Sequence, residues 1–117
     1  MSLHVEISQQ RDVLVVRLDG ELDHHSAAEV RERIDQEWSK GIHGHMVLNL
    51  SKLTFMDSSG LGVILGRYRR ISEMGGKMVL CAVQPSMFRL FELSGMMKIL
   101  PFYEDEQTAL NVCGVAS

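Results

Sequence analysis

Cysteine, positive charge and long hydrophobic runs are all scarce in this sequence of 117 residues. Its two cysteines, Cys81 and Cys113, lie in apolar stretches, so we expect reduced core residues and neither a disulfide nor a metal site. A net charge of −3 leaves no basic stripe to neutralise phosphates, which argues against nucleic acid as the main partner. No apolar run approaches the roughly 20 residues that span a bilayer, and no signal peptide precedes the first strand pattern. We therefore expect a cytoplasmic protein.

Several familiar catalytic patterns are also missing from the sequence. The Gly-x-Ser-x-Gly pattern of serine hydrolases fails around both Ser58 and Ser59, and neither Gly-x-Gly-x-x-Gly nor a Gly-Lys-Ser/Thr phosphate loop occurs. His24 and His25 are adjacent and have no third ligand at a usual spacing, so we interpret them as surface or capping residues. Asp57 as a phospho-acceptor would need Mg²⁺-binding carboxylates at neighbouring strand ends and a cation, and the chain offers few of the first and no lysine after the last strand. We expect no enzyme activity, no metal and no cofactor.

The chain is organised around the stretch 53–66, which reads Leu-Thr-Phe-Met-Asp-Ser-Ser-Gly-Leu-Gly-Val-Ile-Leu-Gly. A strand-like run at 46–50 precedes it and a helix-periodic run follows it, so Asp57, Ser58 and Ser59 are expected in a short loop and the first helical turn. One interpretation is a plain helix N-cap, because Ser and Asp favour that position. However, one cap needs one hydroxyl or carboxylate, and three candidates stand in a row.

The helix that follows contains three glycines, Gly60, Gly62 and Gly66. Each costs about 1 kcal/mol relative to Ala in a helix interior. Gly62 and Gly66 are four residues apart and therefore share a face. Such a bare face lets another backbone come close, and that backbone belongs either to the protein's own sheet or to a partner.

Strand-like and helix-like periodicity alternate along the chain. Strands are predicted at 3–8, 13–18, 45–50, 77–83 and 99–103, and helices from near Ser26, after Ser59, from Pro85 and over 104–112. The first two strands should form an antiparallel hairpin, and the later alternation predicts parallel strands with right-handed crossovers. The sequence thus predicts an α/β fold: a single mixed, mostly parallel β-sheet with about four helices in one domain spanning 1–117. The most apolar strand, 77–83, is expected to be the central strand of the sheet, and Ser26-Ala27-Ala28-Glu29 matches a capping box.

Parallel strands end at a common edge of their sheet, where ligands and partners bind. The loops 20–23, 55–59 and 84–86 are predicted to share that edge. The first loop is acidic through Glu21 and Asp23, and an acidic loop beside an exposed serine suits docking of a basic partner surface. The alternative is a small-ligand or nucleotide-binding domain, or an enzyme, that uses the same edge.

Three stretches together resemble one family: 20–25 (Gly-Glu-Leu-Asp-His-His), 55–62 (Phe-Met-Asp-Ser-Ser-Gly-Leu-Gly) and 90–95 (Leu-Phe-Glu-Leu-Ser-Gly). They are similar to the anti-sigma-factor antagonists with a STAS domain, and most of all to the sporulation type of endospore-forming bacteria. The resemblance covers essentially the whole chain. It implies a STAS-like fold and a switch protein in place of an enzyme.

The resemblance also implies how the switch works. The unphosphorylated antagonist would bind a cytoplasmic anti-sigma factor that is also an ATP-dependent serine kinase, carrying ATP or ADP, and so release a sigma factor for sporulation transcription. The kinase would phosphorylate Ser58, and a metal-dependent serine phosphatase would reverse this; neither nucleic acid nor a membrane is an expected partner. The expected partner-binding residues are Gly20, Glu21, Asp23, Asp57, Ser58, Ser59, Gly60 and Gly62.

Overall fold

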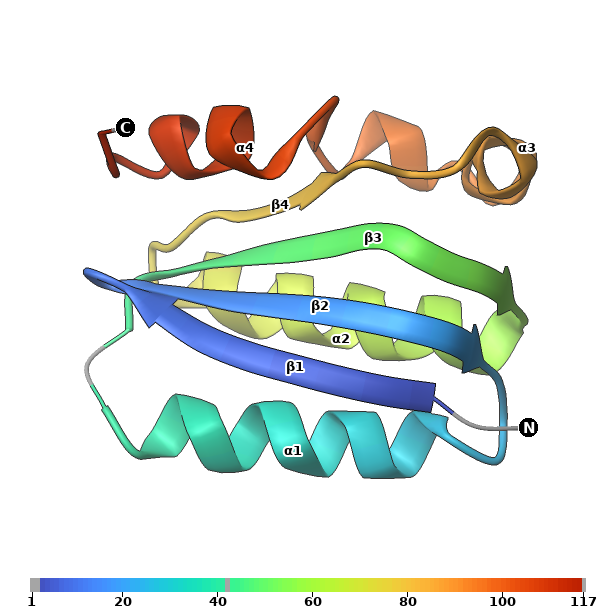
Figure 1. The fold of residues 1–117 in the computed structure, drawn as a ribbon, viewed down its shortest axis with the longest axis horizontal. Helices are drawn as coiled ribbons and strands as arrows, with labels where there is room; N and C mark the ends of the chain where they lie inside the picture. Colours follow the sequence, from blue (N-terminus) through green and yellow to red (C-terminus); the bar gives the residue numbers. More distant parts are fainter. Residues whose placement is uncertain (1–2, 42, 117) are drawn as a thin grey trace.

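A β-hairpin opens the fold, as predicted (Figure 1). In the computed structural model, which describes residues 3–41 and 43–116, β1 (Leu3–Gln10) pairs antiparallel with β2 (Val13–Leu22). Their register places Leu3 opposite Gly20 and Gln10 opposite Val13. The hairpin forms because apolar residues alternate along both segments, so one face of each strand can be buried while the other stays polar.

Three parallel strands complete the sheet. They are β3 (His45–Met56), β4 (Met78–Cys81) and β5 (Phe102–Tyr103), and the spatial order is β1-β2-β3-β4-β5. The pairs β2–β3, β3–β4 and β4–β5 are all parallel, which confirms the predicted mixed, mostly parallel sheet. The expectation that 77–83 is central was wrong, because β3 holds the middle position. The four residues of β4 are apolar because they are buried on both faces.

Helices cover both faces of this sheet (Figure 1). They are α1 (Ala27–Ser39), α2 (Ser58–Glu73), α3 (Pro85–Leu93) and α4 (Glu106–Val112), with a short 3₁₀ turn, η1 (Met96–Lys98), after α3. The helices α1 and α2 lie on one face and α4 lies on the other. The number of helices agrees with the prediction.

The alternation of side chains along the strands divides the core in two. In β2, Leu14, Val16 and Leu18 face the larger cluster under α1, α2 and α3, whereas Val13 and Val15 face a smaller cluster under α4. Both cysteines belong to the smaller cluster, where they are buried and free. Burial raises the pKa of the Cys81 thiol to about 12, so it is held as a neutral core group.

Hydrogen bonds among Arg17, Glu6, Asn49 and Glu106, which we call the clasp, join α4 to the sheet. The guanidinium of Arg17 in β2 donates from Nε and Nη2 to the two carboxylate oxygens of Glu106, each at 2.8 Å, and from Nη1 to Glu6 at 2.5 Å. The Nδ2 of Asn49 also donates to Glu106 at 3.1 Å. The bond from Arg17 outweighs desolvation and lowers the pKa of Glu106, which keeps this carboxylate ionised on the face that α4 covers.

Two helix starts differ from the sequence-based expectation. β3 continues to Met56 and α2 begins at Ser58, so the predicted loop 55–59 shrinks to the single residue Asp57. Ser26 is the N-cap residue of α1, but its side chain makes no capping bond to the helix, so the capping box does not form. Its hydroxyl instead donates to the carbonyl of Glu21 at 3.1 Å.

Candidate functional site

The ends of β2 and β3 lie side by side (Figure 1). Glu21 pairs with Phe55, Leu22 pairs with Met56, and the N–H of Asp57 donates to the carbonyl of Leu22 at 3.3 Å. The prediction that 20–23 and 55–59 share one edge is therefore confirmed. We call residues 20–25 and 55–62 the tip.

The third predicted loop, 84–86, reaches the sheet elsewhere. The pairing of β3 with β4 is limited to residues 46–49 of β3. The Nε2 of Gln84, just after β4, donates to the carbonyl of Ser51 at 2.7 Å. Ser51 lies five residues before Met56 along β3, so this loop meets β3 well short of the tip. Only two of the three loops form the candidate site.

A β-bulge shapes the tip. Between Gly20 and Glu21 the register with β3 shifts, because Gly20 pairs with Leu53 and Glu21 with Phe55. The extra residue, Thr54, donates its hydroxyl to the carbonyl of Gly20 at 3.0 Å. Gly20 has a φ of 120°, a conformation that residues with a side chain rarely adopt, so glycine is required here.

Asp57 is the N-cap of α2. Its Oδ1 accepts from the N–H groups of Ser59 at 2.9 Å and Gly60 at 3.4 Å, and its backbone is extended with φ −109°. Its Oδ2 accepts from the N–H of His24 at 3.2 Å, which joins the two halves of the tip. The carboxylate thus serves both as a helix cap and as a link between the β2–α1 turn and α2.

The two serines differ in access. Ser58, the first residue of α2, is exposed, whereas Ser59 is half-buried. The expectation that Ser59 could act as the cap was wrong, because the Asp57 carboxylate fills that role and Ser59 supplies only its N–H. Of the two hydroxyls, that of Ser58 is therefore the more accessible to a partner.

The acidic side chains of the tip have different surroundings. Glu21 is the next-to-last residue of β2 and half-buried. Asp23 is held in a turn, where its Oδ1 accepts from the N–H groups of His25 at 2.9 Å and Ser26 at 3.1 Å. Desolvation opposes ionisation, but these hydrogen bonds outweigh it and hold the pKa of Asp23 below its usual value. Asp23 therefore organises the start of α1 as well as contributing charge.

The three glycines of α2 also divide by role. Gly60 is buried, and a Cβ built there would lie 2.5 Å from the Met56 side chain and 3.0 Å from the carbonyl of Leu22. Its hydrogen lets α2 pack closely on the ends of β2 and β3. A Cβ at Gly62 or Gly66 would meet no atom within 4 Å. The bare face of these two glycines therefore does not pack against the protein's own sheet.

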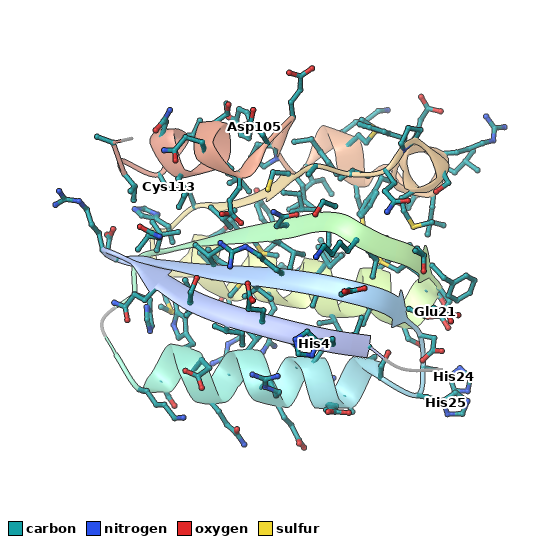
Figure 2. The ribbon with its side chains drawn as sticks, in the orientation of Figure 1. His4, Glu21, His24, His25, Asp105 and Cys113 are labelled. Atoms are coloured by element: carbon teal, nitrogen blue, oxygen red, sulfur yellow. The ribbon has the colours of Figure 1, made fainter. Side chains whose placement is uncertain are left out.

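His24 and His25 complete the tip (Figure 2). The two rings stack with centroids 3.9 Å apart, and Nδ1 of His24 lies 3.8 Å from Oδ2 of Asp57. Figure 2 shows both histidines at the same end of the molecule as Glu21. The sequence predicts only a surface or capping role for these histidines. The predicted proximity of 20–23 and 55–59 is the signal that links His24 to Asp57.

Among residues 3–41 and 43–116, no group of three or more His, Cys, Asp or Glu side chains could hold a metal ion. Within the same residues, no helix is long and apolar enough to cross a membrane. What the tip does offer is an exposed hydroxyl at a capped helix start, beside acidic groups and two imidazoles.

Comparisons with known proteins agree with this architecture. Residues 4–109 match the family described as the STAS domain. The anti-sigma F factor antagonist of Paenibacillus polymyxa is 49% identical over 117 residues, which cover 100% of both chains. The anti-sigma factor antagonist SpoIIAA in its unphosphorylated form has a TM-score of 0.81 at 30% identity, over 97% of this chain and 100% of that one. The phosphorylated form of the Bacillus cell fate determinant SpoIIAA has a TM-score of 0.74 at 32% identity, over 93% and 98%.

These similarities extend over nearly the full length of the chains compared, and they include the tip. They confirm the resemblance to anti-sigma-factor antagonists of the sporulation type that the stretches 20–25, 55–62 and 90–95 indicated. The chain belongs to the STAS domain family.

Proposed function

We propose that this chain is an anti-sigma factor antagonist that works by switching partners. Its unphosphorylated form binds a cytoplasmic anti-sigma factor that is also a serine kinase carrying ATP or ADP, and the sigma factor held by that protein is released. The names of the relatives support this role, because the Paenibacillus polymyxa protein is an anti-sigma F factor antagonist. The resemblance to the sporulation type makes sporulation transcription the process that we propose it regulates, with residues 1–117 acting as one STAS domain in the cytoplasm, where sigma factors operate.

The observation that carries the proposal is the position of Ser58. It is exposed at the first position of a helix whose start is fixed by the Asp57 cap, and it lies beside the paired end of β2 that bears Glu21. A kinase needs a hydroxyl that is accessible and held in one place, and Ser58 meets both needs better than the half-buried Ser59. We therefore propose Ser58 as the phosphorylation site and a serine phosphatase as the protein that restores the active form.

The proposed partner-binding surface is the tip. Its members are the residues expected from the sequence, namely Gly20, Glu21, Asp23, Asp57, Ser58, Ser59, Gly60 and Gly62. The buried Gly60 contributes by letting α2 approach the strand ends, and the open face at Gly62 lets a partner backbone come close. The acidic groups suit a basic partner surface.

A phosphate on Ser58 inactivates the protein at the interface. It adds a charge of about −1.5 to −2, which docking would desolvate beside Asp57, Glu21 and Asp23. Two unit charges 4 Å apart interact by about 4 kcal/mol at an effective dielectric of 20. Even half of that energy weakens binding more than tenfold, since about 1.4 kcal/mol corresponds to a factor of ten. The fold itself stays intact because the phosphate is exposed in the free protein.

The test combines phosphorylation and binding. The purified chain is incubated with the proposed anti-sigma factor kinase and ATP, and the phosphate is mapped by mass spectrometry. The affinity of the phosphorylated and unphosphorylated forms for the kinase is then measured. Phosphate on Ser58, loss of phosphorylation in Ser58→Ala and its retention in Ser59→Ala are expected. Mapping to Ser59, or equal affinity of both forms, would contradict the proposal. Micromolar binding of ATP or GTP by the chain alone would favour the nucleotide-binding alternative.

A further inference from the structure

Asp57 already occupies the donors at the start of α2. Its Oδ1 accepts from the N–H groups of Ser59 and Gly60, and its carbonyl accepts from the N–H of Leu61 at 3.2 Å. Free N–H groups at a helix start usually make a ready anion site. Here the N–H groups of Ser59 and Gly60 are bonded to the Asp57 carboxylate, and that of Leu61 makes the first regular helical bond. Beyond its own backbone N–H, a phosphate on Ser58 must therefore find a positive partner outside the helix start or displace the cap.

The imidazole of His24 is placed to be that partner. Its Nδ1 lies 3.8 Å from Oδ2 of Asp57, and its side chain is 68% exposed, so only its contact with the His25 ring opposes a turn toward a new anion. Ser58 directly follows Asp57, and consecutive Cα atoms are about 3.8 Å apart. A phosphate on Ser58 therefore lies within a side-chain length of the Asp57 carboxylate, which the His24 ring already approaches. The backbone N–H of His24 is bonded to Asp57 at 3.2 Å, which keeps the backbone of His24 beside Asp57 whatever the charge of the ring.

The other charged groups of the tip are acidic. The carboxylates of Glu21, Asp23 and Asp57 come from β2, the β2–α1 turn and the β3–α2 junction, and His25 stacks on His24 with ring centroids 3.9 Å apart. A phosphate adds up to two more negative charges to this set. The imidazoles are the groups of the tip that can gain a positive charge near neutral pH.

We propose that His24 is the counter-charge of phosphorylated Ser58, so that the imidazolium and the phosphate dianion form a proton-linked pair at the tip. The inference rests on the proposed phosphorylation of Ser58. His24 acts as a positioning residue: it holds the phosphate beside the helix start while Asp57 keeps its cap. The pair also makes the charge of the phosphorylated tip depend on pH near neutrality, because imidazoles and phosphate monoesters both change charge in that range.

The test uses the full chain with phosphoserine installed at position 58 during translation, so it does not depend on any kinase. The pH titration of the phosphate is followed by ³¹P NMR. An imidazolium favours the dianion, so in His24→Gln the midpoint of the phosphate titration should rise by about 0.5–1 pH unit. The His24→Lys variant should restore the low midpoint, and high salt should reduce the difference.

His25→Gln is the matched control, because His25 stacks on His24 but bonds through its backbone to Asp23. Its effect should be less than half that of His24→Gln. All variants keep the backbone N–H of residue 24, so the Asp57 cap should survive, and thermal unfolding verifies this. An unchanged midpoint in His24→Gln would overturn the inference. A midpoint shift together with a chain that no kinase modifies would instead refute the proposed function alone.

Discussion

At the scale of single residues, Asp57 does more than the sequence suggested. It was one of three candidates for a helix cap, and the structure shows that its carboxylate caps α2, its backbone N–H bonds to Leu22, and its second oxygen holds the β2–α1 turn through His24. Because Asp57 caps the helix, the Ser58 hydroxyl has no capping role, which suits the modification that we propose for it.

Removing the Asp57 carboxylate should destabilise the fold. Asp57→Ala is expected to lower the free energy of unfolding by about 1–2 kcal/mol, because two helix N–H groups lose their acceptor. Asp57→Asn retains a cap oxygen and should lose less. Urea unfolding at pH 7 measures both. Equal stability of Asp57→Ala and the unmodified chain would show that the cap contributes nothing.

The glycines of α2 should respond in opposite ways to an added methyl group. Gly62→Ala should raise the free energy of unfolding by a few tenths to about 1 kcal/mol, since the site is open and Ala favours helix. Gly60→Ala should lower it, because its Cβ would press on the Leu22 carbonyl. Urea unfolding compares the two.

Affinity for the anti-sigma factor tests whether a partner packs on the bare glycine face of α2. If a partner backbone packs on the bare face, Gly62→Ala should weaken binding to the anti-sigma factor while it stabilises the fold. Gly66→Ala, equally open but one turn farther from Ser58, is the control and should bind more nearly as the unmodified chain does. Full affinity of a stable Gly62→Ala would rule out close approach there.

At the scale of secondary structure, the bulge in β3 explains what the sequence could and could not predict. Met46, Leu48 and Leu50 alternate as a strand should, and this predicted a strand at 45–50. Leu53 is also buried but falls out of that alternation, so the simple pattern ends before it. Two register shifts with β2 account for this: one between Arg17 and Asp19 precedes Leu53, and one between Gly20 and Glu21 follows it and returns Met56 to the buried face. Such a shift depends on contacts with another strand, which local periodicity does not contain.

The sequence predicts the arrangement of the strands but not the side-chain contacts at the tip. The hairpin, the parallel order and the meeting of 20–23 with 55–59 followed from patterns, because hydrophobic alternation and crossover handedness decide them. The contact of His24 with Asp57 did not, since it depends on the exact turn that Asp23 and Ser26 form. Likewise, β4 is apolar because it is buried on both faces, and this pattern alone does not distinguish it from the central strand β3.

The clasp between Arg17 and Glu106 should make the attachment of α4 depend on pH. The pKa of Glu106 is lowered in the folded protein, so the ionised form stabilises the fold fully above the ordinary range of glutamate pKa values, and this contribution is lost as the pH falls through the lowered pKa. Glu106→Gln should therefore lower the free energy of unfolding by about 1–2 kcal/mol at pH 7, with a smaller difference near pH 3. Glu6→Gln is the control, because Glu6 is more exposed and its pair with Arg17 should contribute little. A difference that is independent of pH would contradict this account.

At the scale of the whole molecule, the tip and the clasp of α4 can be tested separately. Figure 2 shows Glu21, His24 and His25 together at one end of the molecule. The clasp lies away from that end, because Arg17 comes four residues before Glu21 along β2 and Asn49 comes seven residues before Met56 along β3. The net charge of −3 is modest, so the acidic groups at the tip, more than the overall charge, are expected to steer a basic partner. Glu106→Gln can then report whether a loss of stability far from the tip affects binding.

The last prediction separates docking from stability at the tip. Glu21→Gln should slow association with the anti-sigma factor and reduce its salt dependence, because removing a charge at the rim of an interface acts mainly on the association rate. Its free energy of unfolding should barely change, since the Ser26 hydroxyl bonds the Glu21 backbone carbonyl and not its side chain. Asp23→Asn should show the charge effect together with a loss of stability, because its carboxylate accepts from His25 and Ser26 at the start of α1. Stopped-flow association at several salt concentrations, paired with urea unfolding, distinguishes the two. An association rate unchanged in a folded Glu21→Gln, Asp23→Asn double variant would show that these carboxylates do not guide the partner to Ser58.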